Sequence, residues 1–113
     1  MVLTQAQALA ITLGVEGALA ALLGPRFSAT RVRAAAAAVG GSLVTHPFVW
    51  WGVLALWPRY GPATTPLFEA AAVAVEAIGY RLIATRRWRD AALLSIIANG
   101  ASWGLGIVLQ RWG

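Results

Sequence analysis

The sequence predicts an all-α integral membrane protein with four transmembrane helices. Hydrophobic residues make up 59% of the chain and charged residues only 12%, against about 45–50% and about 25% in soluble domains. Four apolar runs of about twenty residues each are long enough to cross the hydrocarbon core of a bilayer. A soluble bundle of this size would need polar outer faces, and there are too few charges to supply them. We therefore expect a single transmembrane domain, residues 1–113.

Short stretches of turn residues separate the four predicted helices. Gly24-Pro25 ends the first helix and Pro58 ends the second, because Pro cannot continue the hydrogen-bonding pattern of a helix. The helices are expected at residues 3–23, 34–57, 67–85 and 91–110. The loops between them are expected at residues 26–33, 58–66 and 86–90.

The arginine residues predict the orientation of the chain in the membrane. All nine basic residues are Arg, and the loops after the first and third helices hold six of them: Arg26, Arg31, Arg33, Arg86, Arg87 and Arg89. The opposite side carries Arg59 and Arg111. The positive-inside rule therefore places both Arg-rich loops in the cytoplasm and both termini on the non-cytoplasmic side. We expect these six residues and Arg81 to contact lipid headgroups, and we expect no nucleic-acid partner.

Other residue types narrow the location of the protein. The N-terminus lacks a positively charged region and Glu16 interrupts the first apolar run, so no cleaved signal peptide is expected. The absence of Cys excludes disulfides and thiolate metal sites. Trp50, Trp51 and Trp103 lie deeper in the predicted helices than the other three Trp residues and are expected to face lipid or a partner. We expect the chain in a bacterial inner (plasma) membrane.

One polar pattern occurs twice along the chain. Val15-Glu16 precedes Ser42-x-x-x-His46, and Val75-Glu76 precedes Ser95-x-x-x-Asn99, with an Arg-x-Arg sequence inside each pair. The shared order predicts an internal repeat of two helical hairpins, about residues 1–58 and 66–113. Because both hairpins start on the same side of the membrane, a pseudo-two-fold axis along the membrane normal would relate them.

Each predicted helix carries one strongly polar side chain near its centre, and thus near the middle of the membrane. In hydrocarbon such a side chain costs several kcal/mol, so we expect all four to face one another or a water-filled cavity. Further polar residues lie on the same helical faces. The candidate ligand- or ion-binding residues are Glu16, His46, Glu76, Asn99, Tyr80, Ser95, Ser102 and Glu69.

Two interpretations of these polar groups remain open. Polar side chains and small-residue pairs such as Gly100-x-x-x-Gly104 and Ala36-x-x-x-Gly40 hold membrane helices together without any further function. Structural packing does not require an ionisable group, however. The two central acids, Glu16 and Glu76, therefore favour a functional site.

The sequence favours a non-enzymatic subunit of a larger membrane complex that binds an ion, ligand or partner through this polar cluster. One alternative is a small homodimeric transporter coupled to protons or cations, with His46 as a relay between the two acids. Another is an intramembrane metal-dependent hydrolase, with a metal ion on Glu16, His46 and Glu76. The chain has one His and no His-Glu-x-x-His motif. We therefore assign no catalytic residue, and the cofactor is unknown. The expected partners are the bilayer and either other membrane chains or a second copy.

Overall fold

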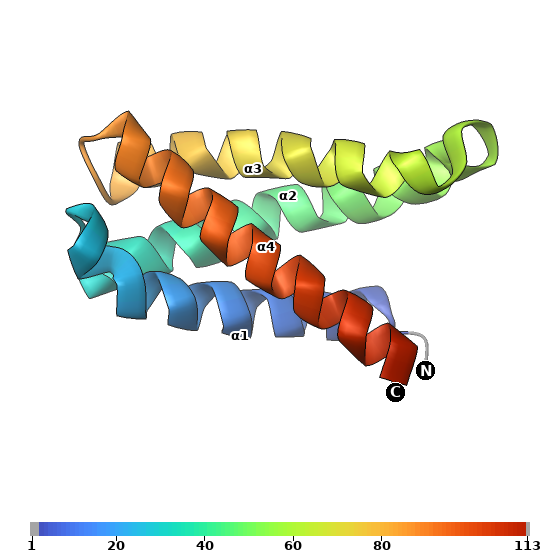
Figure 1. Cartoon of the computed structure of the whole chain (residues 1–113), viewed down its shortest axis with the longest axis horizontal. Coiled ribbons are helices and arrows are strands. Elements are labelled where there is room, and N and C mark those ends of the chain that lie inside the picture. The colour runs from blue at the N-terminus through green and yellow to red at the C-terminus, as the bar shows by residue number, and fades with distance from the viewer. Residues whose placement is uncertain (1–2, 113) are drawn as a thin grey trace.

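The computed structural model describes residues 3–112, and the side chains of residues 3–109. The described residues form long helices joined by short connections, with no strand among them, so the all-α prediction is confirmed (Figure 1). The elements in chain order are α1 (Gln5–Leu23), η1 (Gly24–Phe27), α2 (Arg31–Tyr60), η2 (Gly61–Ala63), α3 (Thr64–Ile83) and α4 (Trp88–Trp112). The prediction that Arg111 lies on the side opposite the Arg-rich loops concerns a side chain outside the described ones.

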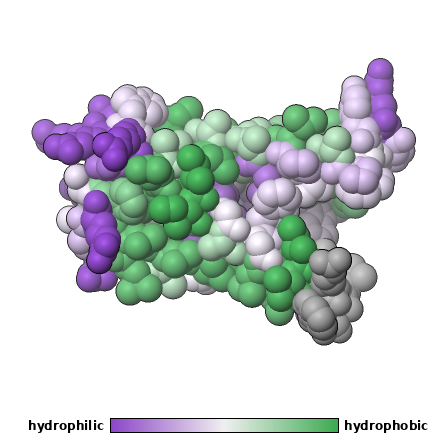
Figure 2. Space-filling model, in the orientation of Figure 1, coloured by the Kyte–Doolittle hydropathy of each residue, from purple (hydrophilic) through white to green (hydrophobic). Residues whose placement is uncertain are grey.

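Three helical stretches are long and apolar enough to cross a membrane. They are Gln5–Phe27, Arg31–Ile83 and Trp88–Leu109, and the middle one contains both α2 and α3. Large apolar side chains such as Val44, Phe48 and Leu82 point outward and are mostly exposed. Figure 2 shows apolar residues over much of the face that it draws, with strongly hydrophilic residues gathered towards the two ends of that face. A surface of this kind is compatible with a membrane location.

The helix α2 is longer than predicted at both ends. It begins at Arg31 rather than Ala34, because the Thr30 hydroxyl accepts a hydrogen bond from the backbone N–H of Arg33 at 3.2 Å and caps the helix there. The prediction that Pro58 ends the helix is wrong. Pro58 removes one backbone donor close to the end of the helix, which continues to Tyr60 and stops at Gly61, where φ is +60°.

The connection between α2 and α3 is shorter than the loop predicted at residues 58–66, for a related reason. The helix α3 begins at Thr64 rather than Leu67, which makes Pro66 its third residue. The first four N–H groups of a helix have no acceptor within it, so a Pro at this position loses no hydrogen bond. Only the three residues of η2 therefore separate α2 from α3. The helix α4 likewise starts before the predicted Ala91, at Trp88.

The four helices surround a central space. Helices that follow one another in the chain lie side by side, and α4 also packs against α1. Figure 1 shows the two Arg-rich connections, after α1 and after α3, at one end of the molecule. The turn η2, the start of α1 and the end of α4 lie towards the other end, and α4 is inclined to its neighbours.

The end with the Arg-rich connections is densely packed. Its core residues are almost completely buried, and they are Ala20, Ala34, Ala37, Ala38, Tyr80, Ala91 and Leu94. Gly24 allows the chain to approach closely here, since a Cβ at this position would lie 2.9 Å from the Ala34 Cβ and 3.2 Å from the carbonyl oxygen of Thr30. A Cβ at Gly40, Gly100 or Gly104 would meet nothing within 4 Å. The close packing suggested by those three glycines is therefore not found among the described residues.

Candidate functional site

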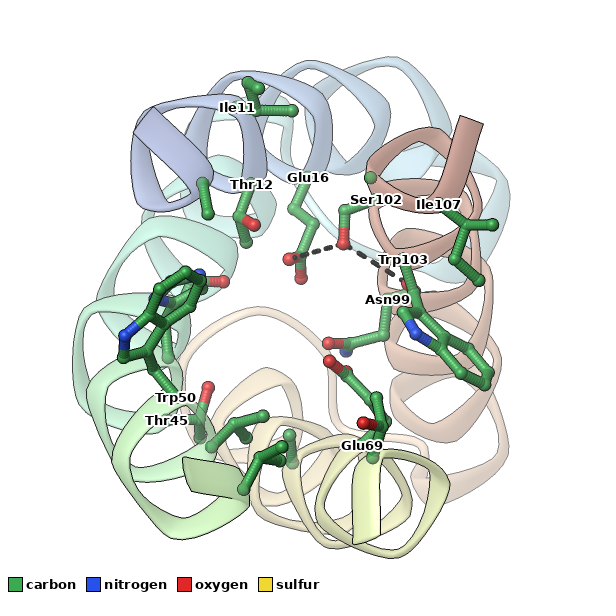
Figure 3. Close-up of a pocket in the computed structure, with 18 of the residues that line it drawn as sticks. Ile11, Thr12, Glu16, Thr45, Trp50, Glu69, Asn99, Ser102, Trp103 and Ile107 are labelled. Carbon is green, nitrogen blue, oxygen red and sulfur yellow. Dashed lines mark hydrogen bonds between the residues drawn. The ribbon is translucent and has the colours of Figure 1, made fainter. Parts of the chain in front are cut away.

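A cavity of about 620 Å³ lies between the four helices, on the side of the core away from the Arg-rich connections. Figure 3 shows side chains from all four helices arranged around this space. Polar residues line its deepest part, and Trp50, Trp103, Ile11 and Ile107 contribute to its walls. The buried polar lining residues are Glu16, Ser42, Thr45, Glu76, Asn99 and Ser102.

Glu76 is held by two hydroxyl groups of α2. The Ser42 hydroxyl donates to its Oε1 at 3.2 Å, and the Thr45 hydroxyl donates to its Oε2 at 3.0 Å. Ser42 and Thr45 lie three residues apart on one face of α2, and both are buried, as is Glu76. Gly41 makes room for the acid, because a Cβ there would lie 3.0 Å from the Glu76 Cγ.

Glu16 has a different environment. Its side chain is 1% exposed, and the Ser102 hydroxyl of α4 donates to its Oε2 at 3.0 Å. Its other oxygen, Oε1, is buried and has no hydrogen-bond partner. Figure 3 shows the Glu16 carboxyl group directed into the cavity. Glu16 and Glu76 are close enough to interact electrostatically. Each of these two carboxyl groups accepts its described hydrogen bonds from hydroxyl groups.

Asn99 and Ser95 connect α4 to α3 beside the cavity. The Asn99 side-chain amide donates to the carbonyl oxygen of Ser95 at 2.9 Å and to the Ser95 hydroxyl at 3.3 Å. The Ser95 hydroxyl in turn donates to the carbonyl oxygen of Val73 at 2.7 Å. Asn99 lines the cavity, whereas Ser95 is fully buried outside its lining.

The other candidate residues occupy three different positions. His46 lines the cavity and stacks on Trp50, with ring centroids 6.1 Å apart. Its Nδ1 has no hydrogen-bond partner, and no described hydrogen bond joins His46 to either central acid. Glu69 lines the cavity from α3. Tyr80 is completely buried in the alanine-rich core and does not line the cavity. Among the described side chains, no three His, Asp or Glu residues gather closely enough to hold a metal ion.

The described arginine side chains lie outside the cavity lining. The Arg81 guanidinium lies over the Trp88 ring, 5.5 Å from its centroid. The six arginines in and beside the two connections are exposed: Arg26, Arg31, Arg33, Arg86, Arg87 and Arg89. An exposed position leaves these side chains accessible to lipid headgroups.

The two residues that hold Glu76 are not among the predicted site residues. Thr45 and Ser42 both contact the acid directly. Their spacing of three residues beside His46 is a signal that could have identified them. Trp50 and Trp103 were predicted to face lipid or a partner, but both line the cavity. A Trp deep in an apolar helix gives no indication of which side of the helix bundle it faces.

The arrangement suits the binding of a small organic molecule. An acceptor without a partner lies at the closed end, and apolar and aromatic side chains form the walls, as in most ligand pockets. No protein-family model, no curated protein and no solved structure matches this chain.

Proposed function

We propose that this chain is a non-enzymatic membrane subunit that binds a small amine, or a similar hydrogen-bond donor, in the cavity above Glu16 and Glu76. The observation that carries the proposal is the buried Oε1 of Glu16, which faces the cavity without a hydrogen-bond partner. A buried polar atom without a partner costs about 1–3 kcal/mol. A donor group on a ligand removes that cost, and a positively charged nitrogen also balances the charge of an acid.

The size and walls of the cavity support a ligand rather than a bare ion. Its volume of about 620 Å³ falls within the range of about 300–1,000 Å³ that is typical of ligand pockets. Trp50 and Trp103 offer aromatic rings, which attract cations through their faces. Hydroxyl groups already satisfy both oxygens of Glu76, so Glu16 is the acid with an acceptor free for the ligand.

The proposal includes a specific arrangement in the membrane. All four helices cross the bilayer as two repeated hairpins, with both termini on the non-cytoplasmic side of a bacterial inner membrane. The exposed arginines at the ends of both connections support this orientation. The cavity then opens on the non-cytoplasmic side, and other membrane chains cover part of the apolar outer surface.

Transport is a second candidate function, and one observation favours it. The cavity reaches two buried acids from one end, and the alanine-rich core closes the other end. A coupled transporter needs an acid that is exposed to one side at a time, and it would need this core to open. Four helices form a thin wall, so a transporter would work as a homodimer. Native mass measurement in mild detergent separates the candidates, since a homodimer supports transport and a heteromeric assembly supports the subunit.

The test of the proposed function compares Glu16→Gln and Glu76→Gln with the unmodified protein. Butylamine binding is measured by calorimetric titration of the protein in lipid nanodiscs. We expect Glu16→Gln to weaken binding about tenfold or more, because the charge-assisted hydrogen bond is lost. Circular dichroism and native mass should remain unchanged in both variants.

The matched control is Asp90→Asn, which removes an acid that lies outside the cavity lining. This variant should bind butylamine as tightly as the unmodified protein. If both Gln variants also keep full affinity, the two acids do not form the binding site. If the unmodified protein binds no amine, the proposed ligand class is wrong.

A further inference from the structure

A second cavity opens on the side of the bundle between α3 and α4. Its volume is about 260 Å³. Four residues line both this side cavity and the central one, and they are Pro66, Glu69, Asn99 and Trp103. The two cavities therefore adjoin each other at these side chains.

The outer part of the side cavity is apolar. Its remaining lining residues are Ala70, Val73, Ile96 and Gly100. Ile96 is 54% exposed, and the missing side chain of Gly100 leaves open space, since a Cβ there would meet nothing within 4 Å. Figure 1 shows α4 inclined to α3, so the two helices separate away from the Arg-rich connections. The side cavity thus forms an apolar groove on a surface that would face lipid.

Polarity changes in one direction along the two cavities. The two central acids lie at the inner end, and Glu69 and Asn99 lie where the cavities meet. Only apolar residues follow towards the outside. A molecule that matches this order has one polar end and one hydrocarbon end, and its hydrocarbon end does not have to fit inside the bundle.

We propose that the ligand is a single-chain amphiphile with an amine head. The head reaches Glu16 in the central cavity, and the hydrocarbon tail passes through the groove between α3 and α4 into the bilayer. This inference rests on the proposed function for the position of the head. The groove provides the site for the hydrocarbon tail. Its position implies that the ligand enters from the membrane rather than from water.

The test uses two glycines of α4 as a matched pair. Gly100 lines the groove, whereas Gly104 lines neither cavity, and an added Cβ would meet nothing within 4 Å at either position. Gly100→Leu should fill the groove, and Gly104→Leu should not. Because both substitutions replace Gly by Leu in the same helix, effects on helix propensity are shared.

A cysteine reporter measures occupancy of the central cavity. The chain has no Cys, so Thr12→Cys introduces a single thiol into the cavity lining. Its alkylation by a maleimide is followed in lipid nanodiscs, with increasing dodecylamine or butylamine as the probe. We expect Gly100→Leu to raise the dodecylamine concentration needed for protection about tenfold. Protection by butylamine should remain unchanged, and Gly104→Leu should change neither.

The possible results separate the two proposals. If butylamine protects but Gly100→Leu and Gly104→Leu respond equally to dodecylamine, the groove does not hold a tail and only this inference fails. If neither amine protects the unmodified reporter, the proposed function fails as well. If the protein is a homodimer and Gly100→Leu dissociates it, the groove is an interface with a second copy of the chain. That result would overturn the proposed binding of a hydrocarbon tail. If Gly100→Leu does not fold, Ile96→Trp fills the same groove and replaces it.

Discussion

The Ser102 hydroxyl of α4 donates to Glu16 of α1 across 3.0 Å, and so connects the first and last helices inside the bundle. Glu76 connects the other two helices, because it lies in α3 and accepts hydrogen bonds from Ser42 and Thr45 of α2. Each acid therefore joins one pair of helices. The same carboxyl groups that line the cavity also help to hold its walls together.

Removal of the Ser102 hydroxyl should destabilise the bundle without unfolding it. Ser102→Ala leaves the buried Glu16 carboxyl group without its described hydrogen bond. The expected loss is about 0.5–2 kcal/mol of unfolding free energy, measured by denaturation in mixed detergent followed by circular dichroism. Ser102→Thr keeps a hydroxyl group and should lose less. Equal stability of Ser102→Ala and the unmodified protein would show that this hydrogen bond contributes nothing.

Gly41 and Gly40 give a test of how Glu76 is positioned. A Cβ at Gly41 would lie 3.0 Å from the Glu76 Cγ, so Gly41→Ala must displace the acid. A Cβ at Gly40 would meet nothing within 4 Å. Both substitutions replace Gly in a helix interior and gain about 1 kcal/mol of helix propensity.

We therefore expect Gly40→Ala to raise the thermal midpoint and keep amine affinity. Gly41→Ala should weaken amine binding several-fold, because the displaced acid alters the deepest part of the cavity. Calorimetric titration with butylamine in nanodiscs measures both variants. Identical affinity in the two variants would contradict a role for the position of Glu76.

Gly24 tests the packing at the end with the Arg-rich connections. Gly24→Ala would bring a Cβ to 2.9 Å from the Ala34 Cβ and 3.2 Å from the Thr30 carbonyl oxygen. Backbone atoms cannot rotate away as a side chain can, so we expect a loss of about 1–3 kcal/mol in unfolding free energy. The control is Gly14→Ala in α1, where a Cβ meets nothing within 4 Å. Mixed-detergent denaturation should show a lower midpoint for Gly24→Ala only.

Cysteine labelling tests the proposed orientation in the membrane. Ser28 lies in the first Arg-rich connection and Ala63 lies in η2, and both are exposed. A membrane-impermeant maleimide should label Ala63→Cys in intact bacterial spheroplasts. Ser28→Cys should react only after the membrane is opened with detergent. Labelling of Ser28→Cys in sealed spheroplasts would reverse the orientation, and the cavity would then open to the cytoplasm.

Composition and apolar run length were sufficient to predict the helical class. The helix ends were harder, because they depend on individual caps and on where a Pro lies within a helix. Pro66 loses no hydrogen bond in the first turn of α3, and Thr30 starts α2 ahead of the apolar run. Neither effect is visible in average hydrophobicity.

The sequence by itself determined that Glu16 and Glu76 interrupt apolar helices, because residue type and depth along a helix can be counted directly. Only the tertiary structure decided which groups meet them. Ser42 and Thr45 contact Glu76, whereas no described hydrogen bond joins His46 to either acid, and Tyr80 is buried in the core rather than in the cavity. The rotation and tilt of each helix control these contacts, and they are set by how alanine and glycine residues from distant parts of the chain pack together.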